Sequence, residues 1–326
     1  MDKPVRYTGP RTAKSKGADI VFDSFGDPAD PAILLVMGLG DQMITWHEDL
    51  CTMIAKQGFH VIRFDNRDIG LSTRFVQYGV PDVVTIAAKK MLGLHPRTPY
   101  TLTDMARDGM SVLDAAGVGS ACVVGASMGG MIAQVMAIEH PDRVSALVST
   151  ISSGQLVPGA SMLLSFAAWN LKNLLGNGGA RLPFSPSAGA LSFIFKDPPR
   201  DRDGFADYYA SLERALVGPG YTADSDKTRE FAKRLYDRGL SPDGTMRQLA
   251  GILASKSRIG DLKKLRVPTL VIHGDSDPLI PVWLGVQTAK LIPGAKLKVF
   301  PGLGHWLPPA MWPEFAGLLA DFTGRK

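Results

Sequence analysis

The chain has 326 residues, of which 45% are hydrophobic and 21% are charged, and its formal net charge is +5. This length is typical of one α/β core domain with an insertion, and the composition is an ordinary globular balance that can fill a sizeable core. The basic residues are scattered, no apolar run reaches membrane-spanning length and no secretory signal follows Met1, so we expect a cytoplasmic protein with no nucleic-acid partner and no membrane span.

The first half of the chain alternates apolar runs with helical patterns. Strands buried on both faces are predicted at 32–37, 60–64, 121–124 and 144–148. Helices are predicted at 46–56, 103–116 and 128–140. Gly58 ends the first helix, Thr103 caps the second and Pro141 stops the third. Strands alternating with helices predict an α/β fold with a mostly parallel sheet covered on both faces.

The alternation stops in the middle of the chain. Residues 151–252 contain no strand-like run, but they include an apolar helical stretch at 162–175 and a Gly/Pro/Ser-rich loop at 176–187. Strands are again predicted at 267–272 and 296–300, and helices at 284–291 and 312–322. We therefore predict a core domain built from residues 1–150 and 253–326, with residues 151–252 inserted as a helical lid.

A candidate nucleophile lies between a predicted strand and a predicted helix. Residues 125–129 read Gly-Ala-Ser-Met-Gly and fit the pattern G-x-S-x-G. The turn in this motif is so sharp that the serine adopts strained backbone angles and exposes its hydroxyl above the sheet. The helix that follows points its N-terminal amides at developing negative charge. We predict Ser127 as the nucleophile; the alternative is a glycine-rich turn with an idle serine.

A serine hydroxyl is a weak nucleophile and needs a general base. Of the six histidines, His305 lies just after the last predicted strand, at the sheet edge from which Ser127 emerges. His273 closes an apolar strand and is expected to serve the local turn. The remaining histidines have structural explanations, although His47 could flank the cleft. We therefore predict His305 as the base.

The base needs a carboxylate that fixes its tautomer and stabilises the imidazolium. Asp275 and Asp277 both follow the penultimate predicted strand. We choose Asp277 because it lies further from the strand and next to Pro278, which stiffens the loop. Asp275 is expected to make turn hydrogen bonds. The chain order Ser127, Asp277, His305 is the order of α/β-hydrolases.

Acyl transfer also requires donors that stabilise the oxyanion. The backbone N–H of Met128, directly after the nucleophile, is one expected donor. The other is the N–H of Leu39, because Gly38 and Gly40 let this loop after the first buried strand turn inward. The alternative for this loop is a plain glycine turn.

These segments resemble the α/β-hydrolase superfamily over about residues 20–150 and 255–322, and more closely the branch of aclacinomycin methylesterases and many bacterial esterases. The resemblance is carried by 36–40 (Val-Met-Gly-Leu-Gly), 63–70 (Arg-Phe-Asp-Asn-Arg-Asp-Ile-Gly), 125–130 (Gly-Ala-Ser-Met-Gly-Gly), 267–278 and 304–305 (Gly-His). It implies the α/β-hydrolase fold, a triad of Ser127, Asp277 and His305, and an oxyanion hole of Leu39 and Met128. Many relatives have His-Gly in place of Met37-Gly38, which keeps the amide donor but changes the packing behind it. Residues 65–68 look like a structural polar loop that joins adjacent strand ends.

The expected function is that of a serine esterase that forms an acyl-enzyme intermediate. A carboxylic ester or lactone of a medium-sized apolar or aromatic compound is favoured because the predicted lid is rich in apolar residues. These are Met162, Leu163, Leu164, Phe166, Trp169, Leu171, Leu174, Phe193 and Phe195. A C–C bond hydrolase, a thioesterase or an amidase with the same triad stays open, because the lid sets the leaving group. A non-catalytic ligand receptor on this fold is the alternative from another class.

Neither a metal nor a cofactor is expected. The sequence has no Cys/His ligand spacing and no phosphate-binding loop followed by Lys. Cys51 and Cys122 each lie in an apolar element, which predicts buried free thiols rather than a disulfide. The expected partner is a small-molecule ester substrate, and the sequence leaves a homo-oligomer open.

Overall fold

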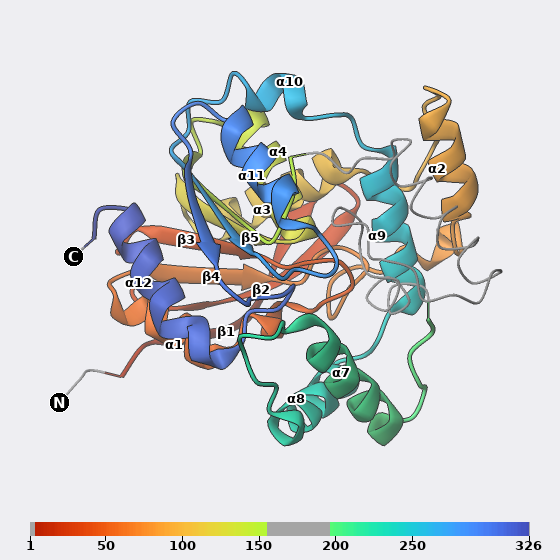
Figure 1. Ribbon diagram of the computed structural model, residues 1–326, viewed down its shortest axis with the longest axis horizontal. Coiled ribbons are helices and arrows are strands. Elements are labelled where there is room, and N and C mark those ends of the chain that lie inside the picture. The colour runs from red at the N-terminus through yellow and green to blue at the C-terminus, as the bar shows by residue number, and fades with distance from the viewer. Residues whose placement is uncertain (1–3, 155–195, 326) are drawn as a thin grey trace.

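The computed structural model describes residues 4–154 and 196–325. Within them, eight strands form one sheet in the order β1-β2-β4-β3-β5-β6-β7-β8 (Figure 1). The strands are β1 (Tyr7–Ser15), β2 (Ala18–Phe25), β3 (Ala32–Val36), β4 (His60–Phe64), β5 (Ala121–Ala126), β6 (Val144–Thr150), β7 (Thr269–Gly274) and β8 (Lys296–Phe300). Strands β3 to β8 form the parallel part of the sheet, in the order β4-β3-β5-β6-β7-β8, so their carboxyl ends meet at one edge. The predicted α/β class and mostly parallel sheet are confirmed.

Helices cover both faces of the sheet. They are α1 (Glu48–Lys56), α2 (Val83–Met91), α3 (Leu102–Ala115), α4 (Met128–Glu139), α7 (Arg202–Leu216), α8 (Ser225–Asp237), α9 (Pro242–Ala254), α10 (Ile259–Leu262), α11 (Val282–Leu291) and α12 (Trp312–Phe322). Short 3-10 turns lie at η1 (Met43–Thr45), η2 (Val76–Tyr78) and η3 (Pro309–Met311). None of the described helices has the length and apolar character needed to cross a bilayer.

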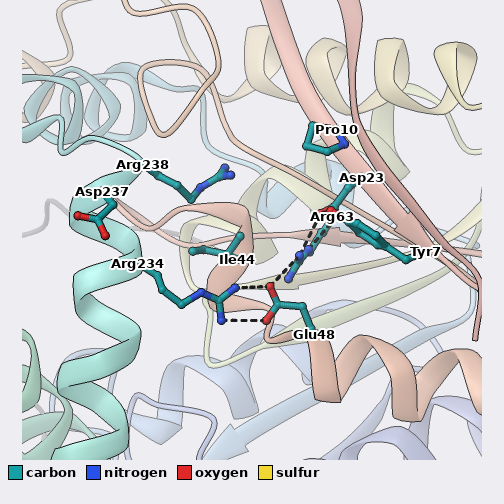
Figure 2. Close-up of a pocket in the computed structure, with 9 residues that line it drawn as sticks. All are labelled: Tyr7, Pro10, Asp23, Ile44, Glu48, Arg63, Arg234, Asp237 and Arg238. Carbon is teal, nitrogen blue, oxygen red and sulfur yellow. Dashed lines mark hydrogen bonds and ion pairs between the residues drawn. The ribbon is translucent and has the colours of Figure 1, made fainter.

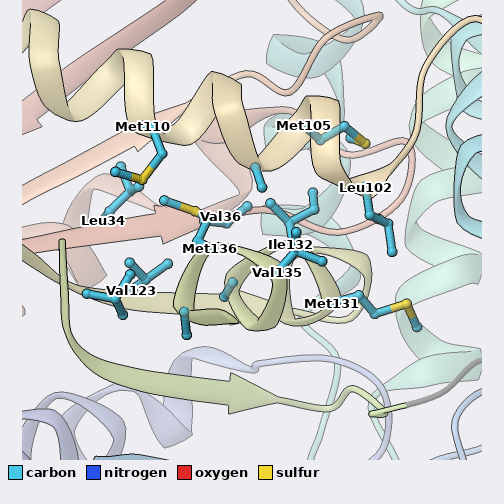
Figure 3. Close-up of a cluster of buried hydrophobic side chains, with 14 of the residues drawn as sticks. Leu34, Val36, Leu102, Met105, Met110, Val123, Met131, Ile132, Val135 and Met136 are labelled. Carbon is cyan, nitrogen blue, oxygen red and sulfur yellow. The ribbon is translucent and has the colours of Figure 1, made fainter. Parts of the chain in front are cut away.

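The core consists of two apolar layers, one on each side of the sheet. Successive side chains of a strand point to opposite faces, and β3 shows the consequence. Leu34 and Val36 pack with α3 and α4 on one face (Figure 3), whereas Ile33 and Leu35 pack with α1 and α12 on the other. A strand buried on both faces therefore appears in the sequence as a continuous apolar run, which is why β3 and β5 were predictable.

Three features of the first 120 residues differ from the sequence prediction, and one of them is α2, which was not predicted. The antiparallel pair β1 and β2 was not predicted, because β1 is largely exposed and lacks an apolar run. Helix α3 begins at Leu102, so Thr103 does not cap it. Thr101 precedes the helix instead, and the Asp104 carboxylate accepts hydrogen bonds from both the Thr101 backbone N–H and its hydroxyl. Thr101 and Asp104 together form a capping box, which stabilises the first turn of α3.

Helices α7, α8 and α9 occupy the described part of the predicted insertion, residues 196–252, where no strand is found. Helices α7 and α8 pack against each other, and α9 packs against α2 at the periphery (Figure 1). The predicted helix at 162–175, the loop at 176–187 and the apolar lid residues between Met162 and Phe195 lie outside the described residues.

The polar loop at residues 65–68 is buried and connects β4 to several other elements. The Asn66 side-chain amide donates to the Met37 carbonyl at 2.9 Å, which joins two neighbouring strand ends as predicted. Asp68 forms a double hydrogen bond with Arg247 of α9, at 2.7 and 2.9 Å. Arg67 pairs in the same way with Asp108 of α3. The loop therefore also anchors α3 and α9, a role that residue types alone did not reveal.

Candidate active site

Ser127 lies in the tight turn between β5 and α4. Its φ of 54° and ψ of −119° put it in a region that non-glycine residues rarely adopt. Both flanking glycines are sterically required, because a Cβ on Gly125 would lie 2.1 Å from the Gly129 carbonyl oxygen. A Cβ on Gly129 would lie 2.0 Å from the Val36 carbonyl oxygen. The strand, the helix and the strained turn are thus those that the G-x-S-x-G motif predicts.

His305 reaches Ser127 from the loop after β8. Its Nε2 lies 3.0 Å from the Ser127 Oγ, and its Nδ1 lies 2.7 Å from Asp277 Oδ2. The loop is held by the end of α7, because the His305 backbone N–H donates to the Leu216 carbonyl at 2.6 Å. Gly304 is needed for this approach, since a Cβ there would lie 1.9 Å from the same carbonyl oxygen. The structure therefore brings Ser127, His305 and Asp277 into one chain of hydrogen bonds.

Asp277 is oriented by the loop that follows β7. Its Oδ1 accepts hydrogen bonds from the backbone N–H groups of Leu279 and Ile280, each at 2.8 Å. Burial by itself would raise the pKa of Asp277, but the charge of His305 and the contacts with His305 and His273 lower it below its usual value. The carboxyl group is therefore ionised and able to hold an imidazolium.

The two residues weighed against His305 and Asp277 have local structural roles. His273 Nε2 lies 2.8 Å from the Ile280 carbonyl oxygen and 3.4 Å from Asp277 Oδ2, so it supports the turn that carries Asp277. Asp275 Oδ1 accepts hydrogen bonds from the Gly302 backbone N–H at 2.7 Å and from the Ser276 hydroxyl at 2.8 Å. Both arrangements match the turn roles expected from the sequence.

The expected oxyanion donors lie on segments that meet at Ser127. Met128 is the first residue of α4, and the first amides of a helix have no intrahelical acceptor. The glycine loop is adjacent, because a Cβ on Gly38 would lie 3.3 Å from the Ser127 Cβ. Gln248 of α9 fastens the loop by accepting a hydrogen bond from the Gly40 N–H at 2.9 Å. Leu39 thus lies between Gly38, which is beside the serine, and Gly40, which Gln248 anchors.

Asp41 is a polar residue beside this site that the sequence reasoning missed. Its Oδ1 accepts a hydrogen bond from the Tyr209 hydroxyl of α7 at 3.2 Å. Burial raises the pKa of Asp41 to about 6, against the lowering effects of the Tyr209 hydrogen bond and the His305 charge. The only available signal was its position, one residue after a glycine loop expected to stabilise negative charge.

A polar hollow of about 310 Å³ lies away from this chain of hydrogen bonds, between β1, β2, α1 and α8 (Figure 2). Its guanidinium groups already have partners. Arg63 bonds to Asp23 at 2.8 and 2.9 Å, and Arg234 bonds to Glu48. Neither Ser127 nor His305 lines the hollow, and its paired charges offer no nucleophile for acyl transfer.

The cysteines are not alternative nucleophiles. Cys51 and Cys122 are buried and free, as predicted. Burial raises the pKa of each thiol to about 12, so neither forms the reactive thiolate at neutral pH. In the described ranges, no group of three or more His, Cys, Asp or Glu side chains is arranged to hold a metal ion.

Known proteins share this architecture. The chain is 27% identical over 303 residues to the rhodomycin D methylesterase DauP of Streptomyces sp. (strain C5), covering 92% of this chain and 93% of the relative. It is 29% identical over 224 residues to a 2-hydroxymuconate semialdehyde hydrolase of Pseudomonas putida, covering 68% and 69% of the two chains. The crystal structure of a hydrolase from Pseudomonas aeruginosa PA01 matches with a TM-score of 0.64 and 25% identity, covering 97% of this chain and 98% of that one.

These similarities agree with the resemblance seen in the sequence motifs, including the methylesterase branch. The family of the alpha/beta hydrolase fold matches residues 31–309, a span that includes the glycine loop, Ser127, Asp277 and His305. The protein is a hydrolase of this fold, and the chain belongs to the alpha/beta hydrolase fold family.

Proposed function

We propose that this protein is a serine esterase in which Ser127 is the nucleophile, His305 the general base and Asp277 the residue that orients the base. The observation that carries the proposal is the chain of contacts from the Ser127 Oγ through both ring nitrogens of His305 to Asp277 Oδ2, at 3.0 and 2.7 Å. A nucleophile, a base and an oriented carboxylate in this sequence of contacts are what acyl transfer requires.

The reaction proceeds in two halves. His305 Nε2 accepts the hydroxyl proton while the Ser127 Oγ attacks the ester carbonyl carbon, and the backbone N–H groups of Met128 and Leu39 stabilise the oxyanion. The C–O bond to the alcohol then breaks, and His305 returns the proton to the leaving alcohol. His305 then deprotonates a water molecule that attacks the acyl-enzyme carbonyl carbon. The bond between this carbon and the Ser127 Oγ breaks, and His305 returns the proton to the Oγ, which releases the acid and free Ser127. Asp277 stays ionised and holds the imidazolium throughout.

The proposed substrate is a carboxylic ester or lactone of a medium-sized apolar or aromatic compound. The similarity to a methylesterase over 92% of this chain supports ester hydrolysis. We further propose that residues 151–252 act as a lid that selects the leaving group, with the core formed by 1–150 and 253–326. Hydrolysis of a C–C bond is the second candidate, favoured by the similarity to a 2-hydroxymuconate semialdehyde hydrolase, because the same three side chains serve both reactions.

Active-site labelling tests the proposal directly. A fluorophosphonate probe is expected to label the wild type at Ser127 and to leave Ser127→Ala unlabelled. The wild type is also expected to hydrolyse p-nitrophenyl esters from acetate to hexanoate. Labelling of Ser127→Ala at the wild-type rate, or an inert wild type towards every ester, would reject the serine esterase assignment.

A further inference from the structure

Asp41, which is partly buried, differs from the fully buried aspartates in having no basic partner among the described residues. Asp23, Asp65, Asp68, Asp108 and Asp277 each bond to an arginine or a histidine. Throughout residues 4–154 and 196–325, by contrast, no lysine or arginine pairs with Asp41. A carboxylate withdrawn from water is costly unless it is paired or hydrogen-bonded. Because the Tyr209 hydroxyl is the one side-chain donor to Asp41 in the described part of the chain, this carboxylate has spare capacity there to accept hydrogen bonds.

Asp41 lies where a bound ester would be within its reach. It follows the glycine loop that contacts Ser127, and the charge of His305 acts on it. Tyr209, which donates to Asp41, also contacts Trp306, the residue after His305, with ring centroids 5.6 Å apart. Asp41 therefore belongs to the loop after β3, which carries the expected oxyanion donor, and is connected through Tyr209 to the loop after β8, which carries the expected base.

The surroundings of Asp41 suit a cation. Among residues 4–154 and 196–325, the ionisable groups that face it are Tyr208 and Tyr209 from α7 and His305 from the loop after β8, and none of these three is a permanent positive charge. Aromatic rings attract ammonium groups through their electron-rich faces. Trp306 is partly exposed and contacts the Tyr209 ring, so an aromatic face and the Asp41 carboxylate together provide both means of holding an amine.

We propose that Asp41 is a specificity residue that favours esters bearing an ammonium or other hydrogen-bond donor and disfavours esters bearing a carboxylate. This inference rests on the proposed esterase function and adds its substrate class. An ammonium group on the ester supplies the positively charged partner that Asp41 lacks among the described residues. A carboxylate would place two like charges together in a site partly removed from water, which is unfavourable.

The test is a competition among three esters of matched size. We choose methyl phenylacetates that carry a para aminomethyl, ethyl or carboxymethyl group, so that one is cationic, one neutral and one anionic at pH 8. The wild type is expected to favour the cationic over the neutral ester in kcat/KM by about tenfold or more, and the neutral over the anionic ester similarly, as for a hydrogen bond to a charged group. Asp41→Asn should bring both ratios to within about twofold of unity.

The control variant is Asp203→Asn, which also replaces an aspartate with an asparagine but at an exposed position in the first turn of α7. Asp203 is exposed, so Asp203→Asn should keep the wild-type ratios. The ratios should also increase as the pH rises through about 6, because Asp41 then becomes charged. Ionisation of His305 affects all three esters and cancels in a ratio. Tyr209→Phe removes a hydrogen bond that favours the charged carboxylate and should move this pH midpoint upward.

The outcomes separate this inference from the function on which it rests. Wild-type protein that hydrolyses all three esters through Ser127 without preference would overturn the role of Asp41 alone. Unchanged ratios in Asp41→Asn would overturn it as well. Failure of wild-type protein to hydrolyse any of the esters, with no labelling of Ser127, would overturn the esterase assignment first.

Discussion

Asp275 and Asp277 are two residues apart, but their environments give them different chemistry. Asp277 is buried, its pKa is lowered by the charge of His305 against the effect of burial, and its Oδ2 contacts the imidazole. Asp275 instead accepts hydrogen bonds from the Gly302 backbone N–H and from the Ser276 hydroxyl in the neighbouring turn. Only the first arrangement influences the tautomer and charge of the proposed base.

Paired substitutions therefore distinguish the two aspartates. Asp277→Asn is expected to lower kcat by about 10³- to 10⁴-fold, because an amide does not stabilise the imidazolium or select the reactive tautomer. Asp275→Asn should stay within about tenfold of wild type, since it alters only a turn. Steady-state hydrolysis of p-nitrophenyl butyrate measures both. A larger loss in Asp275→Asn would transfer the orienting role to that residue.

The strained backbone of Ser127 shows how the fold serves the site at residue scale. A non-glycine residue with a positive φ costs of order 1–3 kcal/mol and persists only where the surroundings enforce it. Here the pairing of β5 with β3 and β6 fixes the residues before the serine, and α4 fixes those after it. The strain holds the hydroxyl at the carboxyl edge of the sheet, where the loops after β7 and β8 carry Asp277 and His305.

At the scale of elements, buried charge pairs attach the helices after residue 196 to the core. Arg247 of α9 and Asp68 are each at most 1% exposed and share two hydrogen bonds. Asp68 also accepts hydrogen bonds from the Tyr100 hydroxyl at 2.6 Å and the Phe75 N–H at 2.7 Å. Breaking such a pair from one side leaves a charge buried without its partner, which is more costly than losing the attraction itself.

Truncating one arginine from each of two ion pairs tests this difference. Arg247→Met is expected to lower the free energy of unfolding by about 3–5 kcal/mol, because Asp68 keeps its charge in a buried site. Arg202→Met is the control, since its pair with Asp237 is exposed on the surface; it should cost less than about 1 kcal/mol. Denaturant unfolding measures both, and equal losses would contradict the role of burial.

At the scale of the whole molecule, His60 links stability to pH. It is 1% exposed at the start of β4, and neither ring nitrogen has a hydrogen-bond partner among the described residues. Burial lowers its pKa below the ordinary value of 6.5. The unfolded chain then binds more protons than the folded one as the pH falls below 6.5, so the contribution of neutral His60 to stability is lost on acidification.

The expected consequence is a steeper loss of stability on acidification in the wild type than in His60→Gln. Thermal unfolding between pH 7 and pH 5 measures the two slopes. Asp41 has a raised pKa and acts in the opposite sense, so the difference between the slopes is the informative quantity. Parallel slopes would show that His60 does not titrate differently in the folded and unfolded states.

The sequence by itself determined the elements whose signals are local. Strands β3 and β5 have continuous apolar runs because both faces are buried, β4 has the apolar pair Val61 and Ile62 at its centre, and α4 follows a glycine-bounded turn, so each is visible within a short stretch. The same reasoning located Ser127, Asp277 and His305, because the carboxyl ends of parallel strands converge at one edge. It missed the antiparallel pair β1 and β2, of which β1 is an exposed edge strand without such a run, and it missed α2. It also misplaced the cap of α3 by two residues.

Tertiary structure alone decided the contacts between residues that are far apart in the chain. Asp41 and Tyr209 are separated by 168 positions, and Asp68 and Arg247 by 179. An isolated aspartate gives no local sign of whether an arginine, a tyrosine or a substrate will be its partner. Partner choice follows from how α7 and α9 pack on the core, and this packing sums many weak apolar contacts that no single motif encodes.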